Sequence, residues 1–126
     1  MITATQAQAD ALYGVGHWLL EQQRYEDAKH LFRTMLLAAP TDERGWLGLG
    51  ACHENTGEDE KAAHLYALAG QACADSVRSA LALCRVLRKL DRDGEADEAY
   101  ARAVELAETS GDADLAALVA SEGGMS

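Results

Sequence analysis

Hydrophobic and polar positions along the chain repeat with a period of 34 residues. The segment YEDAKHLF at 25–32 aligns with DEKAAHLY at 59–66, and GEADEAYARAVEL, which begins at Gly94, supplies a third copy. A small residue and an aromatic residue recur at matching places in the three copies: Ala28, Ala62 and Ala96, and Phe32, Tyr66 and Tyr100. Such periodicity indicates a stack of similar structural units.

Apolar residues inside each copy are spaced by three or four positions, which indicates amphipathic helices. Pro40 follows the end of one such segment, and the NTGED turn follows another. Thr41 or Asp42 can cap the third helix, and Asp75 or Ser76 the fifth. The predicted helices span about 6–21, 25–38, 42–55, 59–73, 76–90 and 94–108, with a short seventh at 112–121.

The period and the order of large and small residues are typical of the tetratricopeptide repeat. The expected fold class is therefore all-α, with three tandem helix-turn-helix repeats in a right-handed superhelix and a C-terminal capping helix. One domain spans 1–126, with repeats at about 9–42, 43–76 and 77–110 and the cap at 112–121.

Glycine inside these helices is explained by close helix crossing. We expect Gly50 to face Ala62 where the two helices of the second repeat cross. Gly16 is expected to face Ala28 at the corresponding crossing of the first repeat. In the third repeat, Cys84 takes this place. The crossing does not account for Gly48.

Composition excludes several classes of function. The formal net charge of −10 argues against a general binder of nucleic acid or anionic membranes. The sequence has no apolar run long enough to span a bilayer and no secretory signal at its start, so we expect a cytoplasmic protein without direct membrane insertion. The odd set of three cysteines is interpreted as buried free thiols.

The first helices of the repeats are expected to line a groove, which forms the candidate binding site. Helical spacing places repeat positions 2, 5, 9 and 12 on the groove side. Besides Asp10, this stripe contains Tyr13, His17, Leu20, Arg44, Leu47, Ala51, Glu54, Arg78, Leu81, Arg85 and Arg88. Alternating apolar and polar positions suit an extended peptide better than a small metabolite.

The segment from Ser76 to Leu90 has four basic residues and no acidic one. Two interpretations stay open. Its arginines either face the groove and meet carboxylates or carbonyls of a partner, or they pair with nearby acidic residues: Asp91, Asp93, Glu95 or Asp97.

No catalytic residue, cofactor or metal site is predicted. His30 and His64 occupy the same repeat position, which reflects the repeat better than metal ligation. Cys52 and His53 are adjacent in a helix and therefore point in different directions. An enzyme is not expected.

The motifs resemble those of a particular family. YEDA at 25–28, WLGLGAC at 46–52, the TG turn at 56–57 and AAHLYALAG at 62–70 are similar to the tetratricopeptide chaperones of bacterial type III secretion systems, in the translocator class. The resemblance covers roughly residues 10–108. It implies a cytoplasmic chaperone that binds an extended segment of a hydrophobic translocator subunit in its groove and keeps that subunit soluble for export.

Two other functions stay open at this point. The chain could be a generic tetratricopeptide adaptor or scaffold, or a chaperone for a needle subunit or another early-exported protein. The carboxylate clamp of chaperone adaptors is poorly matched, because Tyr13, His17 and Gly48 occupy its polar positions.

The chain departs from the family in two places. Family members have an N-terminal stretch implicated in homodimer formation, whereas this sequence begins almost directly at the first repeat. The entry to the third repeat reads ADSVRSALALC instead of the family's proline- and aromatic-containing segment. We therefore do not expect a homodimer to form through that N-terminal stretch, and we expect the choice of cargo to differ from that of the family.

Overall fold

The computed structural model describes residues 4–123, which form seven α-helices and no strand. The expected all-α fold class is confirmed. The observed helix ranges differ from the predicted ones by at most two residues: α1 (Gln6–Glu21), α2 (Tyr25–Ala38), α3 (Glu43–Asn55), α4 (Asp59–Ala72), α5 (Val77–Lys89), α6 (Asp93–Ser110) and α7 (Ala113–Gly123).

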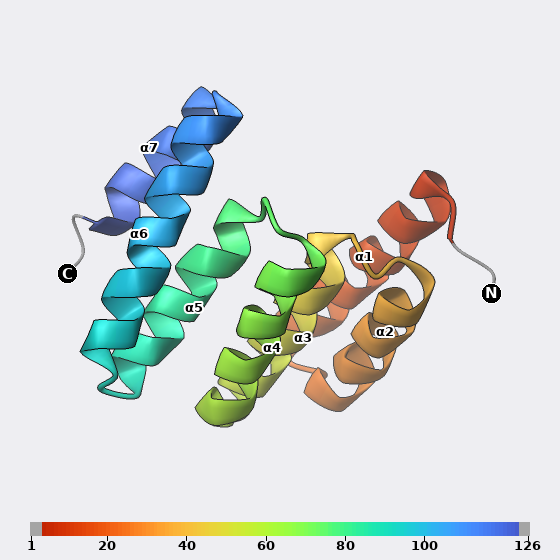
Figure 1. Cartoon of the computed structure of the whole chain (residues 1–126). Helices are drawn as coiled ribbons and strands as arrows, with labels where there is room; N and C mark the ends of the chain where they lie inside the picture. The colour runs from red at the N-terminus through yellow and green to blue at the C-terminus, as the bar shows by residue number, and fades with distance from the viewer. Residues whose placement is uncertain (1–3, 124–126) are drawn as a thin grey trace.

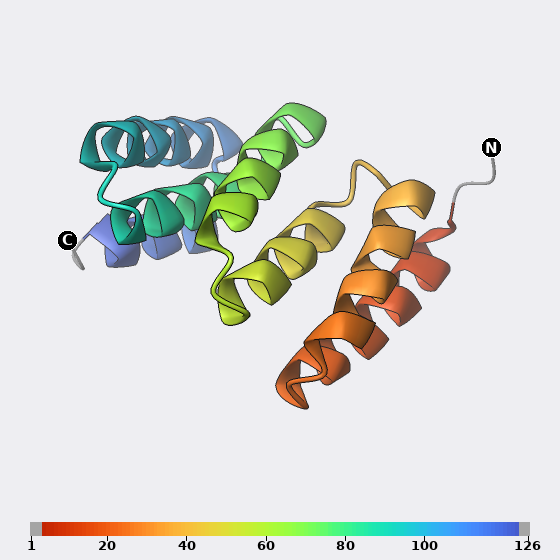
Figure 2. The same ribbon diagram turned by 90° about the horizontal axis from the view of Figure 1, so that it is seen from below.

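Consecutive helices pack as antiparallel pairs, and the pairs stack side by side. The two ends of the described chain lie at opposite ends of this stack (Figure 1). The view from below shows the α1–α2 pair and the α5–α6 pair on either side of α3 and α4 (Figure 2). Each repeat therefore contacts its neighbours along the chain, as expected for a solenoid.

Side-chain caps fix the starts of the first helices. Thr5 forms a capping box with Gln8 before α1. Asp42, rather than Thr41, accepts a hydrogen bond from the Arg44 amide before α3. Ser76 caps α5 by accepting from the Ser79 amide, so Asp75 is not the cap.

The ring of Phe32 on α2 is enclosed by glycines from two different helices. A methyl group at Gly16 of α1 would lie 2.6 Å from Phe32 Cζ, and one at Gly48 of α3 would also overlap the ring. Phe32 is completely buried. Gly48 is thus explained by packing between neighbouring repeats.

Gly50 packs against the ring of Tyr66. The three atoms nearest to a methyl group placed at Gly50 all belong to this ring. Tyr66 lies one turn beyond the predicted neighbour, Ala62, along α4. Tyr66 shares its core cluster with Ala82, which corresponds to Gly48 one repeat later.

α7 covers the end of the third repeat. It contacts both α6 and α5, as α5 contacts α4 and α3. Val119 joins a buried cluster with residues of α5 and α6, and its carbonyl accepts a 3.0 Å hydrogen bond from the Tyr100 hydroxyl. This helix therefore closes the hydrophobic core at the C-terminal end.

We expect Gly48→Leu and Gly50→Leu each to lower the free energy of unfolding by about 1–3 kcal/mol or more, because each overpacks an aromatic ring. Urea denaturation followed by circular dichroism measures this change. Gly14→Ala is the matched control, because a methyl group there meets nothing within 4 Å. It should be neutral or slightly stabilising; equal stability of all three variants would contradict the packing described.

Candidate functional site

The first helices border a hollow of about 390 Å³ between the first and second repeats. We call it the first-helix hollow. Its lining comes mainly from α1 and α3, with Phe32 from α2 and one residue from α5: Tyr13, His17, Leu20, Phe32, Glu43, Arg44, Leu47, Gly48, Ala51 and Arg78.

The structure brings together much of the predicted stripe from the first two repeats. Tyr13, His17, Leu20, Arg44, Leu47, Ala51 and Arg78 all line the first-helix hollow. Sequence reasoning missed three further lining residues: Phe32, Glu43 and Gly48. The sequence did contain a signal for Gly48, because the helix crossing within a repeat does not account for this glycine. Its missing side chain brings the Phe32 ring against α3 at the floor of the hollow.

Arg44 is held rigidly at the rim. Its Nη2 donates to Asp42 Oδ2 at 2.8 Å and to Asp10 Oδ1 at 2.9 Å, and its Nε donates to Asp42 Oδ1 at 3.0 Å. Hydrogen bonding to Asp42 raises the pKa of Arg44 above its ordinary value, with Asp10 adding to the effect. The guanidinium also lies 5.0 Å from the centre of the Tyr13 ring. Its charge is therefore balanced within the protein, and it fixes the position of Tyr13.

His17 extends the aromatic wall started by Tyr13. The two rings stack with their centroids 5.8 Å apart, and His17 Nε2 lies 2.8 Å from Glu21 Oε1. Both side chains are more than half exposed, so solvent weakens this contact. The wall gives the hollow an apolar side with a polar outer edge.

Arg78 is the cation with the weakest internal partner in the hollow. Its Nε lies 3.9 Å from Glu43 Oε1, and 55% of its side chain is exposed. The other oxygen of Glu43 accepts a hydrogen bond from the Ser76 hydroxyl. Arg78 can therefore turn toward an acceptor in the hollow at little cost.

Glu54 binds the cations of α5 at the far end of the predicted stripe. Its carboxylate accepts from Arg85 at 2.7 Å, from Lys89 at 2.9 Å and from the Tyr66 hydroxyl at 2.7 Å. Only 11% of the Glu54 side chain is exposed. Burial raises the pKa of Glu54, but the hydrogen bonds from Lys89, Arg85 and Tyr66 outweigh burial and hold that pKa below its ordinary value.

Of the three arginines of α5 on the predicted stripe, Arg78 lines the first-helix hollow, whereas Arg85 and Arg88 have acidic partners within the protein. Arg85 is bound to Glu54, and Arg88 Nη2 lies 3.3 Å from Asp97, which is one of the acidic residues proposed as its alternative partner. Leu81 is wrongly placed in the groove. It is 5% exposed and packs in the core cluster that includes Val119 of α7.

Cys52 on α3 is completely buried. Burial raises the pKa of the Cys52 thiol to about 11, which leaves no thiolate at neutral pH. Within residues 4–123, no group of three or more His, Cys, Asp and Glu side chains is placed to hold a metal ion. The hollow offers aliphatic and aromatic surface together with one adjustable cation.

Comparison with known proteins identifies the architecture. The family model of the tetratricopeptide repeat matches residues 19–84. The chain belongs to the tetratricopeptide repeat family. No curated protein matches its sequence. Within the described part of this tetratricopeptide repeat protein, no helix is long and apolar enough to cross a membrane.

Several solved structures share the whole fold. The type III secretion translocator chaperone SycD of Yersinia enterocolitica has a TM-score of 0.85 at 23% identity, covering 96% of this chain and 89% of SycD. PcrH has also been solved, as the protein from Pseudomonas aeruginosa and in complex with the chaperone-binding region of PopD. The complex with PopD has a TM-score of 0.81 at 23% identity, covering 99% of this chain and 92% of PcrH. SycD in complex with a peptide of the translocator YopD has a TM-score of 0.76 at 25% identity, covering 94% and 91%.

We expect Glu54→Gln to lower the free energy of unfolding near pH 7 by about 1 kcal/mol, since its cationic partners are nearly half exposed and screened. The folded-state pKa of Glu54 is depressed, so its contribution is present above the unfolded-state pKa and is lost as the pH falls through the folded-state pKa. Urea titrations from about pH 7 to about pH 3 should show the two proteins converging.

The control for this titration is Glu105→Gln, which removes an exposed carboxylate paired with Arg102 at 3.6 Å. It should change stability far less. A constant difference between wild type and Glu54→Gln across the whole pH range would contradict the assigned charge state.

Proposed function

We propose that this chain is a cytoplasmic, non-enzymatic chaperone of a bacterial type III secretion system, whose cargo is a hydrophobic translocator subunit. The first-helix hollow is the observation that carries this proposal, because it presents apolar side chains on an otherwise acidic protein. The likeness of the whole fold to SycD and PcrH, which were solved with segments of YopD and PopD, supports it.

Binding would proceed by masking apolar surface of the cargo. An apolar side chain of an extended cargo segment enters between Tyr13 and Leu47 and is removed from water. Arg78 then donates to a backbone carbonyl or carboxylate of the same segment. The net charge of −10 keeps complexes apart from one another, which prevents aggregation of the bound subunit.

A homodimer is also part of the proposal. Val15 and Trp18 lie three residues apart on α1, and their exposed fractions are 51% and 52%. Two copies that meet through this face would bury both side chains. Light scattering should then show a dimer that Trp18→Glu converts to a monomer, whereas a monomeric wild type would contradict this contact.

The cargo site can be tested by co-expression with the translocator subunit encoded beside this gene, followed by co-purification. We expect Leu47→Asp and Tyr13→Ala to reduce the captured subunit at least fivefold, since each removes apolar surface from the hollow. Arg78→Glu should weaken capture and reduce its dependence on salt.

Leu37→Asp is the matched control for Leu47→Asp, because Leu37 is 77% exposed on α2 and lies outside the hollow. Circular dichroism must show unchanged helical content for every variant. Equal capture by the wild type and the folded hollow variants would show that the cargo binds elsewhere.

A further inference from the structure

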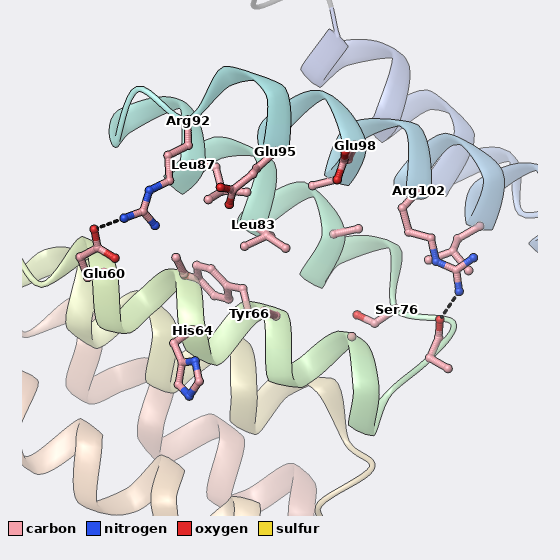
Figure 3. A pocket seen from close by; sticks show the side chains of 17 residues that line it. Glu60, His64, Tyr66, Ser76, Leu83, Leu87, Arg92, Glu95, Glu98 and Arg102 are labelled. Atoms are coloured by element: carbon pink, nitrogen blue, oxygen red, sulfur yellow. Dashed lines mark hydrogen bonds and ion pairs between the residues drawn. The ribbon is translucent and has the colours of Figure 1, made fainter.

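A second groove runs between α4 and α6, with α5 as its floor (Figure 3). We call it the α4–α6 groove. Its volume is about 520 Å³, larger than that of the first-helix hollow. Leu83 and Leu106 are partly exposed and give it apolar surface, and the buried side chains of Tyr66 and Leu87 border it from the core.

The α4–α6 groove lies on the other side of α5 from the first-helix hollow. Leu83 lines the groove, whereas Arg85 binds Glu54 at the first-helix surface. Residues two positions apart in an α-helix, such as Leu83 and Arg85, are separated by about 200° around the helix axis. The two surfaces can therefore be occupied at the same time.

Small residues along α4 keep the groove open over about three helical turns, or about 15 Å, from Glu60 to Gly70. A methyl group at Gly70 would meet nothing within 4 Å. The repeat period provides an internal comparison, because the positions 34 residues earlier hold larger side chains: Lys29 in place of Ala63, Arg33 in place of Ala67, Leu36 in place of Gly70 and Trp46 in place of Ala80.

The equivalent surface between α2 and α4 differs in extent and in charge. Its hollow is bordered by fewer residues and reaches neither Leu36 nor Trp46. Two cations, Arg33 and Lys61, lie on its border. The residue that corresponds to Lys61 one repeat later is Glu95, so the charge at the rim is reversed in the α4–α6 groove.

Charged side chains mark the ends and the rim of the α4–α6 groove. At one end Arg92 pairs with Glu60 across the groove, and at the other Arg102 donates to the Ala74 carbonyl (Figure 3). Between them, Glu95 and Glu98 lie on α6, three residues apart and exposed. No described side chain forms an ion pair with either of these two carboxylates. The rim is therefore complementary to a cationic partner.

We propose that the α4–α6 groove binds an amphipathic helix of a partner protein, with its apolar stripe against Leu83 and Leu106 and its Lys or Arg side chains facing Glu95 and Glu98. A trough flanked by two helices, with a third helix as its floor and about three turns of length, matches the helix-in-groove mode of recognition. This inference does not depend on the cargo proposed for the first-helix hollow.

A second copy of this chain is a poor occupant. Val15 and Trp18 are exposed apolar residues of α1, but α1 has no Lys or Arg among Gln6–Glu21, so α1 of a second copy brings no cation to Glu95 and Glu98. A partner that supplies cations beside its apolar stripe fits both the shape and the charge.

The probe is a synthetic helical peptide of about 15 residues, with Leu at every third or fourth position and two Lys residues beside that stripe. A matched peptide has Glu in place of Lys. Fluorescence anisotropy should show that the Lys peptide binds at least fivefold more tightly than the Glu peptide. Amide NMR shifts should be concentrated at Ala67, Leu83 and Ala99.

Variants of the protein locate the binding. Gly70→Leu fills the groove and should weaken binding of the Lys peptide at least tenfold, whereas Gly14→Leu makes the same change on α1, also at a position where a methyl group meets nothing, and should have no effect. Glu95→Lys with Glu98→Lys should weaken binding by up to about fivefold per charge and remove its salt dependence. Leu37→Asp, at an exposed position of α2 that borders neither the groove nor the first-helix hollow, should leave peptide binding unchanged.

Three results would overturn the proposal. The first is equal affinity for the Lys and Glu peptides, or no binding of either. The second is a set of NMR shifts centred on Tyr13 and Leu47, which would place the peptide in the first-helix hollow. The third is a dimer, seen without peptide, that Gly70→Leu abolishes, because the groove would then be occupied by a second copy.

Discussion

The structure depends on one recurring contact, in which the aromatic ring of a second helix is packed against small residues of the first helices. Phe32 lies against Gly16 and Gly48, and Tyr66 lies against Gly50 in the same cluster as Ala82. Interiors are packed as densely as organic crystals, so a ring can be accommodated between helices only where the facing residues are small. This contact sets how closely each helix pair packs and how it meets the next pair. The shape of the first-helix hollow follows from it, since Phe32 and Gly48 both border that hollow.

The repeat period predicts the fold well because it reports packing that recurs in every unit. Helix ranges follow from it together with the caps and turn residues, and the burial of the three cysteines is predicted separately, from their odd number. The structure also places Tyr13 and Leu47 on one hollow, because these positions depend only on helical spacing within a repeat.

The rest of the site depends on contacts that do not recur. Leu81 has the spacing of a groove residue, yet α7 and α6 bury it, and a stripe on one helix does not report which later helix covers it. Glu54 is bound by two cations of the following repeat, although the residue 34 positions earlier is Leu20 and the one 34 positions later is Arg88. Ion pairs of this kind arise from three-dimensional proximity, which the sequence pattern does not contain.

These differences make the first-helix surface unequal along its length. Between the first two repeats it is apolar, with Arg78 weakly held at the rim. Beyond Ala51 it is occupied by the ion pairs of Glu54 and then by the packing of α7. The part of the surface available to an apolar anchor is therefore concentrated in the N-terminal half.

The position of α7 has a consequence for the order in which the stack opens. In a linear array, each repeat is stabilised mainly by its immediate neighbours, and an end covered by an additional helix is held on two sides. The third repeat has this cover from α7, whereas α1 leaves Val15 and Trp18 exposed to solvent. Local unfolding should accordingly have a direction, with backbone amides of α1 and α2 exchanging with solvent before those of α5 and α6. A protein built in this way is held firmly at its C-terminal end, whereas the other end, which contributes Tyr13 and His17 to the hollow, opens more readily.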